Sequence, residues 1–319
     1  MTSISSLAAL SDNFFIELSD YSVVSVTGED AADYLHGQLT VNTKSFDHQS
    51  ARWSAHCDFK GKTWAVQLIQ SNPSGFVLSA NASANEASLE QLQKYGVFSK
   101  VTFATTAQKQ CIVRGPWATQ FMTQIFGGIP SAEGQSLSKG SDFCCELPGL
   151  AEHYLLILSD DNYSALIADA KSNTVDEYDS VVFEALSIRA GLPCVAFDTV
   201  NQFVPQMMNL QALNAIDFDK GCYMGQEVVA RTRYLGKNKR AAYPLVTNHY
   251  VKCTIGATID KQVGDNWRKG GTVLREASLT NETWLLAVLA NDTQTGDELR
   301  LGEDQPTIFK TLDIPYSIE

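Results

Sequence analysis

The chain has 319 residues and a mass of 34.9 kDa, enough for one large domain or two to three ordinary ones. This length excludes a very small domain that lacks a hydrophobic core of its own. Hydrophobic residues make up 44% and charged residues 19%, without a low-complexity tract, so the composition predicts a soluble globular protein. Thirty-six acidic residues against 24 basic ones give a net charge of −12. This charge disfavours a protein that works mainly by coating nucleic acid or an anionic membrane.

The cysteines are scattered along the chain without a C-x-x-C pair: Cys57, Cys111, Cys144, Cys145, Cys194, Cys222 and Cys253. This spacing argues against a disulfide framework, a zinc site and a self-contained iron-sulfur site, so we predict no metal centre and a reducing compartment. Residues 1–15 contain neither Lys nor Arg, unlike a secretory signal, and no segment approaches the roughly 20 apolar residues that span a bilayer. We therefore expect a cytoplasmic protein without a membrane partner.

Strand and helix signals alternate in the first hundred residues. Thr27 and Asp30 have the spacing of a helix cap, and Gly96 has the position of a helix stop. The predicted elements are strands over 14–18 and 22–26, a helix over 31–39, strands over 64–69 and 76–78, and a helix over 87–95.

In the second part of the chain, the sequence predicts short strands, two helices and then a barrel. Between 111 and 158, short apolar runs alternate with turns, and helices are expected over 162–171 and 179–191. Beyond about residue 240, short runs bounded by turn residues predict a small C-terminal β-barrel. We therefore divide the chain into an α+β region of two intertwined subdomains over 1–239 and a barrel domain over 240–319.

Residues 220–240 form a basic window in this acidic chain. They hold six basic residues and one acidic residue, Glu227, so their net charge is +5 and that of the remaining chain is −17. Such a window is typical of a segment that binds phosphate or carboxylate-rich ligands. The alternative is a solvated linker in front of the barrel. The basic residues are Lys220, Arg231, Arg233, Lys237, Lys239 and Arg240.

Cys222 is the best candidate for a reactive thiol. Gly221 and Gly225 flank it, residues 226–231 have the pattern of the first turns of a helix, and Lys220 lies two residues away. A helix N-terminus and a nearby cation both favour the thiolate form of cysteine. The alternative is a small apolar side chain packed under a turn.

The octapeptide Lys-Gly-Cys-Tyr-Met-Gly-Gln-Glu at 220–227 resembles the K-G-C-Y-x-G-Q-E signature of the YgfZ-type folate-binding, tRNA-modifying proteins, relatives of the glycine-cleavage aminomethyltransferase. Other segments resemble this family as well, so the resemblance spans nearly the whole chain. They are residues 56–62, 94–95, 98–101, 202–206, 209–210 and 315–317.

The resemblance implies an aminomethyltransferase-like α+β fold of three parts around a central channel, with the barrel last. It also implies tetrahydrofolate or another folate as the ligand. The family supports iron-sulfur enzymes such as tRNA methylthiotransferase, which implies an indirect link to tRNA modification. We therefore expect a folate-binding accessory factor more than an enzyme, without strong direct binding to nucleic acid.

Several site residues follow from the same resemblance. Cys222 corresponds to the functional thiol of the family. Tyr21 and Phe183 stand where the family has tryptophans that line the folate site, and both can still stack on a ring. Phe183 fits the apolar face of its own helix equally well. The remaining residues expected to contact the folate are Arg189, Lys220, Gln226, Glu227 and Arg231.

Two positions depart from the family pattern. Arg189 stands where relatives often carry a glutamate, which in the aminomethyltransferases is thought to hold the N–H groups of the pterin. Arginine only donates hydrogen bonds, so Arg189 is expected to face either the carboxylate tail of folate or solvent. The aminomethyltransferases also place paired aspartates near the early strand, whereas here Asp58 alone follows Cys57. Asp58 fits a turn before Gly61 at least as well as a catalytic role.

Two other functions stay open at this stage. A tetrahydrofolate-dependent aminomethyl transferase is disfavoured by the missing glutamate and the missing second aspartate. A direct RNA-binding protein is disfavoured by the net charge of −12 and by the lack of an RNA motif with interleaved aromatic residues.

Overall fold

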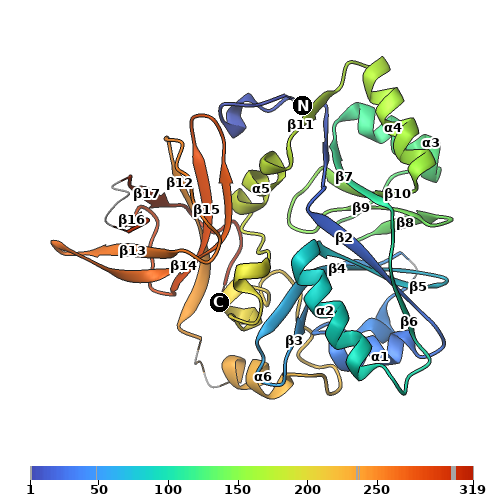
Figure 1. Cartoon of the computed structure of the whole chain (residues 1–319), viewed down its shortest axis with the longest axis horizontal. Helices are drawn as coiled ribbons and strands as arrows, with labels where there is room; N and C mark the ends of the chain where they lie inside the picture. The colour runs from blue at the N-terminus through green and yellow to red at the C-terminus, as the bar shows by residue number, and fades with distance from the viewer. Residues whose placement is uncertain (1, 48, 235, 237, 303–306, 319) are drawn as a thin grey trace.

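A computed structural model describes residues 2–47, 49–234, 236, 238–302 and 307–318. Two β-sheets with their helices form one side of the molecule, and a closed barrel forms the other (Figure 1). Helix α5 (Ser180–Arg189) lies between these two sides. The predicted α+β class with a C-terminal barrel is confirmed.

The five-stranded sheet is antiparallel, in the order β3-β4-β5-β2-β6. Leu35 of α1 and Leu92 of α2 pack against strand residues such as Ile69 and Leu78, so both helices cover one face. The elements are β2 (Tyr21–Thr27), α1 (Ala31–Gln38), β3 (Ala51–Cys57), β4 (Thr63–Asn72), β5 (Gly75–Asn81), α2 (Ala82–Tyr95) and β6 (Thr102–Thr105).

The six-stranded sheet has the order β11-β1-β7-β10-β9-β8, with only β1 and β11 parallel. Phe121 of α3 and Leu166 of α4 pack against Val113 and Leu156, so these two helices cover its outer face. Its elements are β1 (Phe14–Glu17), β7 (Lys109–Arg114), α3 (Pro116–Phe126), β8 (Ser136–Lys139), β9 (Asp142–Glu146), β10 (His153–Leu158), α4 (Asp160–Ser172) and β11 (Asp176–Tyr178).

Two local predictions are wrong. Residues 116–126 were expected as strand and turn, but they form α3, with Gly115 at φ 99° before it and Pro116 at its first position, where a missing N–H costs nothing. The cap of α1 is Asp30 rather than Thr27. Asp30 caps the helix by position only: its carboxylate makes no hydrogen bond to the helix and accepts the Lys100 backbone N–H at 2.7 Å.

The barrel closes in the order β12-β15-β14-β13-β16-β17. Leu245, Leu285 and Phe309 are among the side chains that fill its interior. Its strands are β12 (Arg240–Thr247), β13 (Thr258–Val263), β14 (Asn266–Ser278), β15 (Thr283–Ala290), β16 (Glu298–Arg300) and β17 (Phe309–Thr311). Helix α6 (Gln226–Tyr234) precedes the barrel, and short 3-10 helices lie at Leu7–Ala9, Thr43–Ser45, Phe197–Thr199 and Pro205–Met208.

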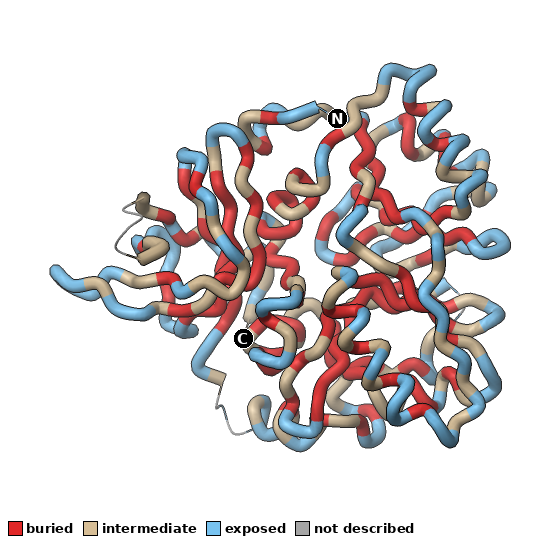
Figure 2. The backbone as a smooth tube through the Cα atoms, in the orientation of Figure 1, coloured by how far each residue is buried: buried red, intermediate tan, exposed pale blue. Residues whose placement is uncertain are grey.

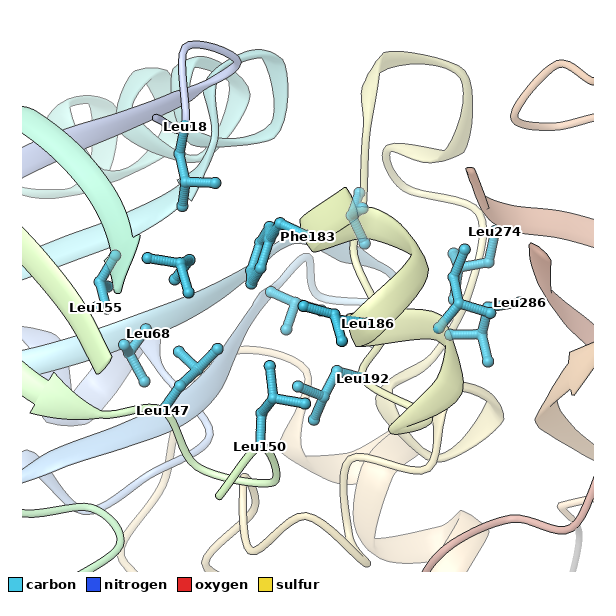
Figure 3. Packing of buried hydrophobic residues seen from close by; sticks show 14 of the residues in the cluster. Leu18, Leu68, Leu147, Leu150, Leu155, Phe183, Leu186, Leu192, Leu274 and Leu286 are labelled. Atoms are coloured by element: carbon cyan, nitrogen blue, oxygen red, sulfur yellow. The ribbon is translucent and has the colours of Figure 1, made fainter. Parts of the chain in front are cut away.

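The largest hydrophobic core lies where the two sheets meet the barrel. It joins the inner faces of both sheets to the outer face of β14 and β15, with α5 in the middle. The buried stretches of all three parts converge on this region (Figure 2), and Phe183 and Leu186 of α5 point into it between Leu68 and Leu286 (Figure 3). Among the described residues, no helix is both long and apolar enough to cross a membrane.

Candidate functional site

A small, partly enclosed cavity lies within the central core, where side chains from all three parts meet. Tyr21 comes from β2, Trp53 from β3, Phe183 and Ser187 from α5, and Arg275 from barrel strand β14. The remaining lining is mostly aliphatic, and the open space is about 20 Å³. That volume holds about one water molecule. The cavity is therefore nearly filled by its own side chains.

Arg275 holds a network of buried polar groups at this cavity. Its guanidinium donates from Nε to Glu184 Oε2, from Nη2 to the Tyr21 hydroxyl at 2.9 Å and from Nη1 to the Leu192 carbonyl at 3.0 Å. The Tyr21 hydroxyl in turn donates to Glu184 Oε1 at 3.1 Å. Only 3% of Arg275 is exposed, and burial alone disfavours its charge, but Glu184 raises its pKa. The network thus links β2, α5 and β14 through the Arg275 guanidinium, whose charge is balanced by the Glu184 carboxylate.

A β-bulge turns Arg275 toward the cavity. In β14, Val273 pairs with Ala287, but the next pair is Arg275 with Leu286, so Leu274 is an extra residue. Val273 points into the barrel core, whereas Arg275 faces the body of the protein. In a regular strand these two residues would share one face, because side chains alternate. The bulge therefore moves Arg275 out of the barrel interior.

The aromatic pair predicted from the sequence meets in this cavity. The rings of Tyr21 and Phe183 lie edge to face with centroids 5.7 Å apart, and the Arg275 guanidinium lies 5.3 Å from the Phe183 ring centroid. Burial raises the pKa of Tyr21 well above its usual value, so its hydroxyl stays protonated. Ser187 is fully buried, and its Oγ has no hydrogen-bond partner among the described residues. The cavity therefore combines aromatic walls, one cation and one unpaired hydroxyl.

Arg189 lies elsewhere. It occupies the last position of α5, is exposed, and is not among the described residues that line the cavity. Although the residue as a whole is exposed, partial burial of its guanidinium lowers its pKa, Arg114 adds to this effect, and Glu282 opposes it. Arg189 therefore lies outside the cavity, and its contact with the carboxylate tail of folate stays a prediction.

Cys222 lies on a second, exposed site, the cysteine loop, which we define as residues 220–225. The Lys220 side chain beneath it is buried, and its ammonium donates to three backbone carbonyls, those of His36 and Leu39 at 2.6 Å and of Val41 at 2.8 Å. Burial lowers the pKa of Lys220 to about 7, while Asp217 acts in the opposite direction. The Lys220 ammonium therefore anchors the loop to the C-terminal end of α1.

The other side of the cysteine loop packs against the turn after β3. Gly225 has φ 84°, and a Cβ atom at this position would lie 2.5 Å from the Asp58 carbonyl oxygen. Only glycine fits such a close approach at a positive φ. Asp58 Oδ1 accepts the backbone N–H groups of Lys60 at 2.9 Å and Lys62 at 2.7 Å. Asp58 thus forms the turn considered as the alternative to catalysis, and Cys222 is held on the surface.

The remaining predicted contact residues lie on α6. Gln226 is the first residue of this helix, which starts four residues after Cys222. Glu227 and Arg231 are exposed and form an ion pair with 3.6 Å between Oε1 and Nη1. None of these three lines the cavity among the described residues, and Lys237 of the basic window lies outside those residues. Apart from Arg189, the predicted residues therefore fall into a cavity group and a group at the cysteine loop and α6.

The cysteines differ sharply in accessibility. All seven lie among the described residues, and of these only Cys222 is exposed. Burial raises the pKa of Cys57 to about 12 and that of Cys194, which lines the cavity, to about 11. A thiol with a raised pKa that lies away from solvent is a poor nucleophile. Cys222 is the accessible thiol of the chain.

Four residues of the cavity and its network were not predicted from the sequence, namely Trp53, Glu184, Ser187 and Arg275. Glu184 and Ser187 follow Phe183 on α5, so helical spacing from that residue could have indicated them. Nothing in the sequence places Arg275 next to them, because 91 residues separate it from Glu184 and the bulge reverses its expected face.

Comparison with known proteins gives consistent matches. The family model described as "YgfZ, beta-barrel domain" matches residues 238–304. "tRNA-modifying protein YgfZ" of Colwellia psychrerythraea is 35% identical over 98% of this chain and 96% of its own. The protein with the same name from Yersinia enterocolitica is 34% identical over 95% and 92%.

A solved structure shares the fold. The glycine cleavage system aminomethyltransferase T from Bartonella henselae superposes with a TM-score of 0.75, at 14% identity, over 96% of this chain and 86% of its own. The predicted aminomethyltransferase-like fold is therefore confirmed. The identity to the two bacterial relatives over nearly the full length settles the family, as the octapeptide at 220–227 indicated, and the chain belongs to the YgfZ family.

Proposed function

We propose that this protein is a folate-binding accessory factor that supports iron-sulfur enzymes and, through them, tRNA modification. The observation that carries the proposal is the pairing of two features in one YgfZ-family chain. One is an aromatic cavity at the junction of three structural parts, and the other is a single exposed thiol on a loop anchored at Lys220 and Gly225.

The chemistry of the cavity lining suits a folate ring. Tyr21 and Phe183 offer aromatic surfaces, and the unpaired Ser187 hydroxyl and the Arg275 guanidinium offer hydrogen bonds at the wall. The open space of about 20 Å³ is too small for a bicyclic ring. A ring therefore enters only when lining side chains move aside. A reduced folate, when bound, carries one-carbon units.

The thiol supports the accessory role. Cys222 is exposed, while Lys220 and Gly225 fix the backbone on either side of it. A thiol presented in this way reaches the surface of a client protein, where it makes transient contact with sulfur or a cluster. The relatives carry the name "tRNA-modifying protein", and we extend this role to the present chain through iron-sulfur clients such as tRNA methylthiotransferase.

A tetrahydrofolate-dependent aminomethyl transferase is the second candidate, favoured by the shared fold with aminomethyltransferase T. Its weakness is the state of Asp58, whose Oδ1 already accepts two backbone N–H groups of its own turn. Turnover of a folate one-carbon donor by the purified protein alone would favour this candidate.

Folate binding is tested by titrating 5-formyltetrahydrofolate against tryptophan fluorescence. Trp53 lines the cavity and donates from Nε1 to the Pro148 carbonyl at 2.8 Å, so its emission should report ring entry. We expect a saturable change that is absent in a Trp53→Phe variant. No saturable change at high micromolar ligand contradicts the folate role.

The accessory role is tested by complementation. In a strain lacking its own YgfZ protein, the wild-type chain should restore tRNA methylthiolation, whereas a Cys222→Ser variant should not. Cys253→Ser is the matched control, because this partly buried thiol lies in the barrel domain. Full restoration by Cys222→Ser contradicts a role for the thiol.

A further inference from the structure

We propose that Arg275 is the ligand-recognising residue of the central cavity, with Glu184 as its positioning residue, and that it selects a planar ring that presents a carbonyl oxygen. This inference rests on the proposed folate binding and names the specificity of that site.

The hydrogen bonds of Arg275 leave it able to bind a ligand. The contacts to Glu184, Tyr21 and Leu192 use three of the five N–H groups of a guanidinium. Arg275 is among the residues that line the cavity, and in our proposal its two remaining N–H groups face the ring that enters. Arginine cannot lose its proton in this setting and therefore acts only as a donor.

Glu184 fixes the direction of these donors. Its two carboxylate oxygens bind the Tyr21 hydroxyl and Arg275 Nε, and the carboxylate is not among the described groups that line the cavity. It therefore orients the guanidinium from behind rather than touching a ligand. The cost of burying the cation is offset by this partner.

A second, independent group in the wall points to the same ligand class. Ser187 lies one turn after Phe183 on α5, is fully buried, and has an Oγ without a partner among the described residues. A buried hydroxyl without a partner costs free energy that a polar ligand atom would recover. Aromatic walls with an arginine and a hydroxyl suit a flat heteroaromatic ring with an acceptor on its edge.

Arg275 thus recognises the ring by donating hydrogen bonds to its carbonyl oxygen. Neither of the arginines expected at this site from the sequence, Arg189 and Arg231, is among the described residues that line the cavity, and both are exposed. Arg275 reaches the cavity from the barrel instead, because of the bulge at Leu274. The barrel domain therefore contributes the residue that decides which ring is accepted.

Folic acid and aminopterin test this inference, because they differ only in a 4-oxo or 4-amino group on the ring. We expect the wild-type protein to bind folic acid about 10- to 100-fold more tightly, the range for a hydrogen bond from a charged donor. An Arg275→Met/Glu184→Gln double variant should lose this preference, so that the two affinities agree within about twofold. The double variant removes both charges together, so neither is left buried and unpaired, and its Tm verifies folding. Arg189→Met, the matched control, should keep the wild-type preference.

The outcomes separate the two proposals. If the wild-type protein binds 5-formyltetrahydrofolate but the folded double variant keeps the preference for folic acid, Arg275 is only a structural clamp and this inference fails alone. A wild-type protein that binds the reduced folate without preferring folic acid over aminopterin also overturns it. If the wild-type protein binds none of the three ligands, the proposed folate binding fails and this inference with it.

Discussion

The central cavity and the cysteine loop are stabilised by different kinds of contact. In the cavity, polar side chains from β2, α5 and β14 bind one another, and the backbone contributes one carbonyl. In the loop, Lys220 and Gly225 secure the chain almost entirely through backbone carbonyls of α1 and of the turn at Asp58. The cavity is therefore sensitive to side-chain partners, whereas the loop is sensitive to backbone geometry.

This difference explains which residues tolerate change. A side-chain network requires its members to change together, while a loop held through its backbone permits any side chain that leaves the anchors intact. Cys222 is accordingly free to serve chemistry, and the cavity residues must serve stability and recognition at once. Single substitutions in the two regions should therefore lower the free energy of unfolding by different amounts.

The largest effect is expected from Arg275→Met. This change leaves Glu184 without its cationic partner, and breaking a buried ion pair in this way costs about 3 to 5 kcal/mol. We expect the lower end, because 23% of the Glu184 side chain is exposed. Urea unfolding measures the loss. A cost below about 1 kcal/mol would mean that the network adds no net stability.

Gly225→Ala tests the backbone contact of the loop. The added Cβ would meet the Asp58 carbonyl oxygen at 2.5 Å with φ at 84°, so we expect a loss of about 2.5 kcal/mol, less than for Arg275→Met. Gly236→Ala is the control, since Gly236 has φ 57° and no atom within 4 Å of the added Cβ. It should cost about 1 kcal/mol. Equal losses for the two variants would show that the close approach has no energetic weight.

Lys220→Met tests the ammonium anchor. Methionine fills a similar volume but leaves the three carbonyls without their donor, so we expect the free energy of unfolding to fall by about 2 kcal/mol. Lys239→Met changes an exposed lysine of the same basic window and should stay within about 0.5 kcal/mol of the wild type. A Lys220 variant as stable as the Lys239 variant would contradict the anchoring role.

Cys222→Ser should have the smallest effect on stability, within about 0.5 kcal/mol, because the side chain is exposed. The same residue should dominate thiol labelling of the native protein. We expect iodoacetamide at pH 8 to modify Cys222 first and the buried Cys57 only on unfolding, since burial raises the pKa of Cys57 to about 12. Mass spectrometry of peptides measures both rates, and comparable rates would contradict the contrast.

Much of the architecture followed from local patterns in the sequence. The helices α1, α4 and α5 and the barrel were indicated by apolar spacing and turn residues. Helix α3 was not, although its apolar residues form three adjacent pairs, at 117–118, 121–122 and 125–126, that recur at helical spacing after Gly115 and Pro116. The sequence therefore contains a helical signal for α3 as well as for the three helices named above.

The candidate site divides in the same way. The cysteine loop is continuous in sequence, so its octapeptide could be recognised directly, and the aromatic pair Tyr21 and Phe183 followed from family positions. The network around Arg275 could not be predicted, because it assembles residues from three distant strands and helices. Its key orientation depends on a bulge, which breaks the alternation on which strand predictions rely.

The interleaving of the two sheets has a consequence for how the chain folds as it leaves the ribosome. Strand β1 is made first but pairs with β7 and β11, whose residues extend to Tyr178, whereas the five-stranded sheet is complete at Thr105. During synthesis the strands of the five-stranded sheet can therefore pair early. Residues 14–17 of β1 have both neighbouring strands only after about 160 more residues have been added. The amino-terminal strand is the last piece of its own sheet to find both neighbours, so slow translation across 109–178 prolongs its exposure.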